Sequence, residues 1–276
     1  MSLKQRSPQW LAVVGAGLLA MGTSALAQPA TNYEPKSGQP GKDVVWVPTP
    51  QALVDQMLDM AKATPQDYVI DLGSGDGRTV ITAAKRGIKA HGIEYNPDMA
   101  ELAKRNAVQA GVTDKATFAN GDIFESDFSQ ATVVTLFLLP GLNVRLRPTL
   151  LDMKPGTRVV SNSFTMGDWE PDNSVTVSED CTSFCKAYLW IIPAKAGGKW
   201  QLGQSELTIE QQYQTFTGKL VTGNVIAPIT QGRLNGDRIV FTAGDTQYTG
   251  SVKGNAMEGT SKAGGAEAKW QATRQQ

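Results

Sequence analysis

The sequence predicts an α/β protein with a doubly wound sheet, followed by a small all-β domain. Three observations lead to this prediction. Apolar strand-like runs alternate with helical segments between residues 51 and 194, a glycine-rich loop joins the first strand to a helix, and short runs punctuated by glycine take over after residue 197. Alternating strands and helices build a parallel sheet covered on both faces. With 276 residues, 41% of them hydrophobic, the chain is long enough to bury such cores.

The N-terminal segment has the order of regions found in secretory signal peptides. Lys4 and Arg6 precede the apolar run WLAVVGAGLLAMGTSALA, which ends in small residues at Ala27. We therefore predict a signal peptide over residues 1–27 and a secreted or periplasmic protein. The alternative is an uncleaved membrane anchor that leaves the domain in the cytoplasm, although the run is short for a span. Residues 28–43 are rich in proline and glycine and are predicted to be a linker.

Residues 44–196 carry the alternating pattern of the first domain. The first helix is expected over residues 51–61, where apolar side chains recur at helical spacing. Pro148 is expected to kink or split the helix that contains it. Strands are predicted over 68–72, 89–94, 116–120, 131–139 and 156–164, helices over 79–86, 97–110 and 142–153, and a closing antiparallel pair over 173–179 and 186–194.

Residues 197–276 form the predicted second domain, a small antiparallel meander or barrel. Asn235-Gly236 between two β-rich runs is a hairpin signal, and turn residues recur at short intervals. Its aromatic side chains are expected in the core rather than on a ligand-binding face. They are Trp200, Tyr213, Phe216, Phe241, Tyr248 and Trp270.

Composition narrows the possible functions. Basic and acidic residues number 26 each, which gives no reason to expect nucleic acid as a partner. His91 is the only histidine, so no zinc site with the usual ligand spacing can form, and no metal is expected. Cys181 and Cys185 can either close a small disulfide loop in an oxidising compartment or remain two thiols. We expect a monomer, with membrane association only if the N-terminal segment is retained.

The glycine-rich loop in VIDLGSGDGR is the candidate ligand site. Gly73, Gly75 and Gly77 follow the first strand, so their backbone faces the crevice at the carboxyl end of the sheet and a ligand can approach the main chain closely. A nicotinamide or flavin fingerprint would need glycine or alanine at the position of Arg78, and the P-loop signature is absent. Asp71 stands two residues before the first glycine.

This D-x-G-x-G-x-G pattern resembles the first motif of class I, seven-β-strand, S-adenosylmethionine-dependent methyltransferases. The resemblance implies a Rossmann-like doubly wound methyltransferase sheet, S-adenosyl-L-methionine as cofactor and an ammonium of its methionine end near Asp71. It further implies that Glu94 accepts both ribose hydroxyls, that Asp122 lies near the adenine amino group and that Ile123 lies beside the ring. The expected cofactor-binding residues are Asp71, Gly73, Ser74, Gly75, Gly77, Glu94, Tyr95, Asp122 and Ile123.

The methyl acceptor is suggested by the end of the fourth strand. FLLPGLN, residues 137–143, differs from the Asn/Asp-Pro-Pro-Tyr pattern of enzymes that methylate amide or adenine nitrogens. Together with VPTP, DLGSGDGR and MKPGTRVVS, it resembles the family that includes the ATP-synthase c-subunit lysine N-methyltransferases, over residues 44–194. That resemblance implies an enzyme that methylates a protein lysine nitrogen, with Leu139 and Pro140 lining the methyl-transfer pocket and Thr49 near its mouth. The alternatives are a small-molecule methyltransferase and an exported, non-catalytic binding protein.

Overall fold

A computed structural model describes residues 1–2 and 33–275 of the chain. Residues 3–27 of the predicted signal peptide and residues 28–32 of the predicted linker lie outside the described residues. Within the described part, none of the helices combines the length and the apolar character that crossing a bilayer requires.

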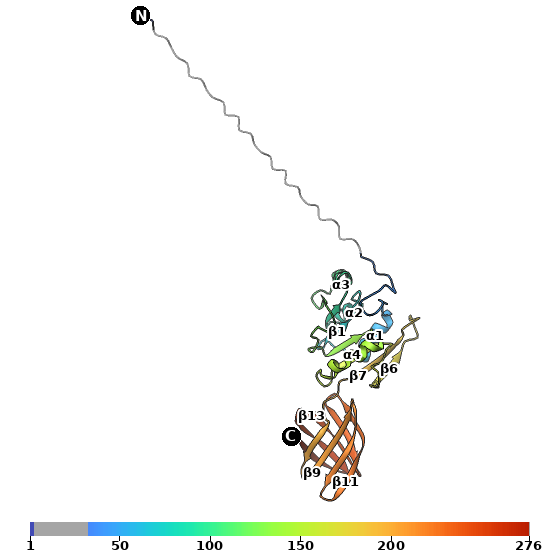
Figure 1. Ribbon diagram of the computed structural model, residues 1–276, viewed down its shortest axis with the longest axis vertical. Helices are drawn as coiled ribbons and strands as arrows, with labels where there is room; N and C mark the ends of the chain where they lie inside the picture. The colour runs from blue at the N-terminus through green and yellow to red at the C-terminus, as the bar shows by residue number, and fades with distance from the viewer. Residues whose placement is uncertain (3–32, 276) are drawn as a thin grey trace. The chain divides into compact units, whose positions relative to one another are not determined.

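The first domain is built on a seven-stranded sheet in the order β3-β2-β1-β4-β5-β7-β6 (Figure 1). β1 to β5 are parallel, and β7 runs antiparallel to both β5 and β6. The strands are β1 (Tyr68–Leu72), β2 (Lys89–Glu94), β3 (Ala116–Asn120), β4 (Val133–Leu136), β5 (Arg158–Asn162), β6 (Asn173–Thr176) and β7 (Lys186–Ile191). The doubly wound prediction and its closing antiparallel pair are confirmed. The strand order reverses between β1 and β4, which is where open α/β sheets bind ligands.

Helices cover both faces of this sheet and create two separate cores. They are α1 (Gln51–Met60), α2 (Arg78–Lys85), α3 (Pro97–Gln109) and α4 (Pro140–Leu151). The first three pack on one face and α4 packs on the other. Successive strand residues alternate between the two cores, so that Val69 faces α1 and α2 whereas Ile70 faces α4. Burial of a leucine such as Leu53, which is fully buried, contributes about 1.5–3 kcal/mol.

Two details around α4 differ from the sequence prediction. β4 ends at Leu136 rather than at residue 139, so residues 137–139 leave the sheet before α4 begins. Pro148 does not split the helix, which continues to Leu151. Pro148 has no backbone N–H to donate to the carbonyl of Val144, four residues earlier. Both residues lie on the exposed side of the helix, where water can donate to that carbonyl instead.

The second domain is a closed eight-stranded antiparallel barrel, which confirms the all-β prediction. Trp200, Phe241 and Trp270 are buried in its interior. The hairpin turn lies one residue later than the Asn235-Gly236 signal indicated: Asn235 is the last residue of β11 and pairs with Arg238, so Gly236 and Asp237 form the turn. Ala194 and Ala196, which precede the first barrel strand, are buried in the same core. The strands are β8 (Gly198–Leu202), β9 (Ser205–Gln212), β10 (Thr215–Thr222), β11 (Val225–Asn235), β12 (Arg238–Ala243), β13 (Thr246–Lys253), β14 (Ala256–Ala263) and β15 (Ala266–Arg274).

The barrel shares buried contacts with the sheet domain through the β9–β10 turn. Tyr213, which we expected in the barrel core, instead stacks on Trp169 with ring centroids 5.6 Å apart. Gln214 accepts a hydrogen bond from Trp169 Nε1 at 2.7 Å and donates to the Glu170 carbonyl at 2.7 Å. Since Trp169 also packs in the core beneath α4, the barrel contacts the sheet domain through buried side chains as well as through the connecting segment.

Candidate functional site

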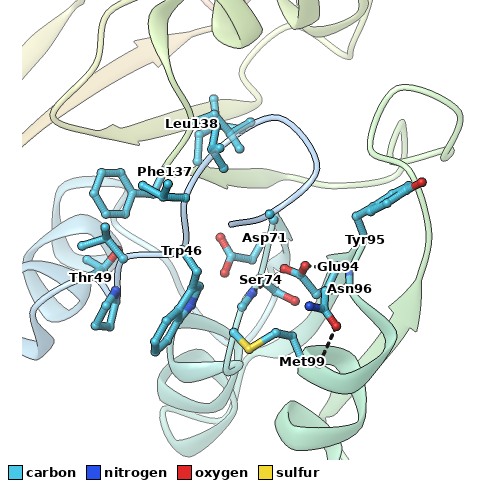
Figure 2. Close-up of a pocket in the computed structure, with 18 of the residues that line it drawn as sticks. Trp46, Thr49, Asp71, Ser74, Glu94, Tyr95, Asn96, Met99, Phe137 and Leu138 are labelled. Atoms are coloured by element: carbon cyan, nitrogen blue, oxygen red, sulfur yellow. Dashed lines mark hydrogen bonds between the residues drawn. The ribbon is translucent and has the colours of Figure 1, made fainter. Parts of the chain in front are cut away.

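A cavity of about 550 Å³ opens at the carboxyl ends of the parallel strands (Figure 2). Its walls come from the loops after β1, β2, β3, β4 and β5, and from residues 39–49 before α1. A volume of this size falls in the range of roughly 300–1,000 Å³ that is typical of small-molecule sites. Residues 39–43, which we expected in a linker, are therefore part of the cavity wall.

The glycine-rich loop has a backbone conformation and close contacts that require glycine. Gly73, Gly75 and Gly77 have φ of 80°, 52° and 83°, a conformation that favours glycine. A Cβ on Gly75 would lie 2.6 Å from Trp46 Nε1, so this glycine lets the segment before α1 lie against the loop. Gly77 does not line the cavity; a Cβ there would lie 2.7 Å from the Phe118 ring, so Gly77 serves the packing beneath the loop.

Ser74 lines the cavity, but its side chain is directed at β2. A Cβ on Gly92 would lie 2.5 Å from Ser74 Oγ, which shows how closely the serine covers that glycine. Within the described residues the Ser74 hydroxyl is buried and has no hydrogen-bond partner. The loop therefore needs a small residue at position 74 and a glycine at position 92.

Glu94 ends β2 with its carboxylate fixed by two backbone amides. Its Oε2 accepts a hydrogen bond from Gly75 N at 2.8 Å, and its Oε1 accepts one from Asn96 N at 2.9 Å. Each carboxylate oxygen has a further lone pair. The Glu94 carboxylate is thus oriented to accept two more hydroxyl groups, which is what the vicinal diol of a ribose presents.

Asp71 lies at the floor of the cavity and is 7% exposed. Burial raises the pKa of the Asp71 carboxyl to about 7, and the neighbouring charges of Glu94 and Asp76 act in the same direction. Hydrogen bonds from Thr135, at 2.6 Å, and from Thr79 oppose this rise in pKa. A cationic group placed in the cavity would favour the charged carboxylate, so this end of the site suits an ammonium.

The opposite end of the cavity is formed by Tyr95, Asp122 and Ile123. Asp122 accepts a hydrogen bond from Phe124 N at 2.9 Å and forms an ion pair with Lys42. That ion pair lowers the pKa of the Asp122 carboxyl. Lys42 also lies over the Tyr95 ring, 4.6 Å from its centroid, so the segment before α1 crosses this end of the site.

Three residues were expected at the acceptor end, and the structure places two of them in the cavity wall. Leu139 lines the cavity and is 46% exposed, which indicates that it lies at the cavity opening. Thr49 is buried in the wall, where its hydroxyl accepts a hydrogen bond from Asn162 at 3.2 Å. Pro140 is exposed at the start of α4 and is not among the described residues that line the cavity.

Sequence reasoning missed the residues that come from irregular segments. Lys42 and Trp46 lie in an irregular stretch with several proline and glycine residues. That composition gave no indication that the two residues line the cavity. Phe137, Phe164 and Phe184 also line the cavity, from three loops that are distant in sequence. Phe137 and Phe164 fell inside predicted strands and Phe184 fell between two of them, so no local pattern marked these residues.

The structure also places the cysteines and the histidine. Cys181 and Cys185 are joined in a disulfide. His91 lies in β2, where its Nδ1 is 2.8 Å from Thr117 Oγ1, and burial lowers the pKa of its imidazole. Among the described residues, no three histidine, cysteine or acidic side chains are grouped as metal ligands would be.

Comparison with known proteins places this site in a family. The model of the ANTKMT methyltransferase domain matches residues 71–173. A protein-lysine N-methyltransferase of Saccharolobus islandicus is 45% identical over 54% of this chain and 94% of its own length. The adenine nucleotide translocase lysine N-methyltransferase of Mus musculus is 32% identical over 43% of this chain and 52% of its own length, so only about half of that relative is matched.

A solved structure gives the same result for the fold. An RNA methyltransferase from Salinibacter ruber, in complex with S-adenosyl-L-homocysteine, has 48% sequence identity and a TM-score of 0.51, and the match covers 54% of this chain and 95% of that chain. The match to the family model ends at residue 173, before the C-terminal barrel begins. Because the chain is 45% identical to a protein-lysine N-methyltransferase and covers 94% of it, the chain belongs to the same family and is an S-adenosylmethionine-dependent methyltransferase.

Proposed function

We propose that the protein transfers a methyl group to the Nε of a lysine in a protein substrate. The observation that carries this proposal is the match to the S. islandicus protein-lysine N-methyltransferase, which spans 94% of that enzyme at 45% identity. The chemistry of the acceptor end agrees with it. Leu138, Leu139 and three phenylalanines form an apolar wall there, which suits the long alkyl stem of a lysine.

The cofactor-binding roles of individual residues are part of the proposal. Glu94 would accept both ribose hydroxyls, supported by the two backbone amides that orient its carboxylate. Asp71 would pair with the ammonium of the methionine end, supported by its burial and its raised pKa. Tyr95, Asp122 and Ile123 would contain the adenine, since they form the far end of the same cavity.

The proposed reaction requires positioning and dehydration more than covalent help from the protein. Bound S-adenosylmethionine supplies a methyl group on a sulfonium, which is already a good leaving group. The apolar wall lowers the pKa of an entering lysine ammonium, since burial disfavours the charged form. Leu138 and Leu139 then help to exclude water and to align the amine for transfer at short distance.

The experiment is to incubate the purified protein with methyl-labelled S-adenosylmethionine and each of three acceptors. The acceptors are poly-L-lysine, a total RNA extract and a protein-free metabolite extract. We expect label in poly-L-lysine, recovered as Nε-methyllysine after acid hydrolysis. Label confined to RNA, the substrate class in the name of the S. ruber relative, or to a small metabolite would refute the proposal. Glu94→Gln is the control, and at a cofactor concentration below the Kd it should lower transfer to every acceptor by a similar factor.

We further propose that the protein is exported to an oxidising compartment. The basic and apolar order of residues 4–27 supports this proposal, and so does the Cys181–Cys185 disulfide. Mass determination of the N-terminus from native material tests it. Processing after Ala27 is expected, whereas an intact Met1 end in a membrane fraction would favour the anchor alternative.

A further inference from the structure

We propose that Phe137, Phe164 and Phe184 form an aromatic wall that selects the acceptor, and that the Cys181–Cys185 disulfide holds Phe184 in that wall. The inference rests on the proposed lysine methylation. It adds a specificity-determining surface and a redox dependence of acceptor use, both from residues outside the cofactor-binding half of the cavity.

The three rings form one continuous surface at the acceptor end. The ring centroids of Phe137 and Phe184 are 5.2 Å apart and meet edge to face. Phe164 lies 6.1 Å from Phe137 and 6.2 Å from Phe184. All three line the cavity, beside Leu139 at its opening. Such a surface can pack against the alkyl stem of a lysine, and its exposed ring faces can attract the lysine while it enters the cavity as an ammonium, before burial favours loss of the proton.

Phe137 and Phe164 are fixed by the sheet domain itself. Phe137 follows directly after β4 in the centre of the sheet. Phe164 follows β5, and its carbonyl accepts a hydrogen bond from the buried Asn143 of α4 at 3.3 Å. Asn143 also donates to the Thr165 carbonyl at 3.3 Å, so the loop carrying Phe164 is attached to α4 at two points. Neither ring depends on the disulfide.

Phe184 reaches the wall from an exposed loop between β6 and β7. It has φ of 57°, a conformation that a bulky side chain rarely adopts, and it is 39% exposed. The disulfide closes the loop immediately beside it, at Cys185, and Val177 N donates to the Cys185 carbonyl at 2.9 Å. An unfavourable backbone conformation in an exposed segment persists only where the surroundings impose it. The disulfide is the covalent element here that can do so.

Opening the disulfide should therefore release Phe184 from the wall. A dithiol delivers two electrons and two protons to the sulfur–sulfur bond, which yields two cysteine thiols while the dithiol becomes its own cyclic disulfide. Cofactor affinity should not change, because Asp71, Glu94 and Asp122 lie at the ends of β1, β2 and β3, on elements that the loop does not support.

The test compares acceptor kinetics with cofactor binding in the same set of proteins. Wild type, Phe184→Ala, Phe184→Leu and Cys181→Ser/Cys185→Ser are assayed for kcat/KM on poly-L-lysine and for the calorimetric Kd of S-adenosylhomocysteine, each with and without dithiothreitol. We expect Phe184→Ala to lower kcat/KM about 5- to 10-fold, the range expected for one lost aromatic contact with a partly hydrated cation. The Kd should stay within about twofold. Phe184→Leu, which keeps apolar bulk, should lose less.

The measurements with dithiothreitol test whether the disulfide acts through Phe184. Dithiothreitol should lower kcat/KM in wild type to about the level of the double serine variant, and it should have no effect on Phe184→Ala. An unchanged kcat/KM in Phe184→Ala would overturn the inference, and so would equal sensitivity of wild type and Phe184→Ala to dithiothreitol. In either case the proposed function would stand as long as wild type methylates lysine. If wild type bound S-adenosylhomocysteine but methylated no lysine, the proposed function itself would fail, and the lysine-selecting wall with it.

Discussion

Replacing Asp71 by asparagine should make the stability of the protein less dependent on pH. The folded-state pKa of Asp71 is about 7, compared with 3.8 for an ordinary aspartate. Because the folded pKa is the higher one, the folded protein binds more protons than the unfolded chain between about pH 4 and pH 7. Wild-type stability should therefore fall as pH rises through that window and level off above it.

The size of the effect follows from the pKa shift. One pKa unit corresponds to about 1.4 kcal/mol, so a shift from 3.8 to about 7 corresponds to roughly 4 kcal/mol as an upper value. Asparagine is always neutral and can still accept the hydrogen bond from Thr135. We expect the advantage of Asp71→Asn over wild type in free energy of unfolding to grow by about 2–4 kcal/mol between pH 4.5 and pH 7.5.

The assay is urea unfolding followed by circular dichroism at several pH values. Asp114→Asn, which changes an exposed aspartate, is the matched control and should follow wild type. A difference between Asp71→Asn and wild type that stays constant from pH 4.5 to pH 7.5 would refute the reasoning. The same carboxylate should tighten binding of S-adenosylhomocysteine in wild type as pH rises through 7, and Asp71→Asn should lose this dependence.

Three further changes test the architecture of the site. Gly75→Ala should weaken S-adenosylhomocysteine binding at least 10-fold and disturb Trp46 fluorescence, because the new methyl group would lie 2.6 Å from Trp46 Nε1 and φ is 52°. Glu94→Gln should raise the calorimetric Kd for S-adenosylhomocysteine by about 10- to 100-fold, since hydrogen bonds to a charged group contribute about 1.5–3 kcal/mol each. Gln214→Ala should lower the free energy of unfolding by about 2–3 kcal/mol in urea titrations, because it removes a partner of the buried Trp169 indole.

Each of these changes has a control and a contradicting result. Gly141→Ala, at a glycine with open space around it, should bind as wild type does, and equal losses in both variants would show a general effect of the added methyl. For Glu94→Gln, an unchanged Kd would remove the carboxylate from ribose binding. Gln247→Ala changes a glutamine on the outside of the barrel, and a matching loss of stability there would contradict the role given to the Gln214 contact.

Local patterns in the sequence were sufficient to predict most of the sheet domain. β2 spans residues 89–94 and β3 spans residues 116–120, both as expected, because short apolar runs between turn signals leave little freedom in where a strand begins and ends. The place of the glycine-rich loop and of Glu94 at the carboxyl edge of the sheet was predictable from chain order, since that order fixes which strand ends meet at one edge of a parallel sheet. The ribose-binding role of Glu94 came from the resemblance to the methyltransferase family and stays a prediction. The limit appeared at residues 137–139, where a wholly apolar run ends a strand early to line a cavity.

What only the tertiary structure decided concerns contacts between segments that are distant in the chain. The aromatic wall joins residues 137, 164 and 184, and Lys42 reaches Asp122 across 80 residues. The stacking of Tyr213 on Trp169 is a contact of the same kind. The disulfide between Cys181 and Cys185 is local, but the sequence left the choice between a disulfide and two thiols open. The sequence by itself determined the strand and helix order, the glycine-rich loop after the first strand and the separate β domain, because these depend on residues close together in the chain. The acceptor surface and the attachment of the barrel depend on packing between loops, which no local period or motif encodes.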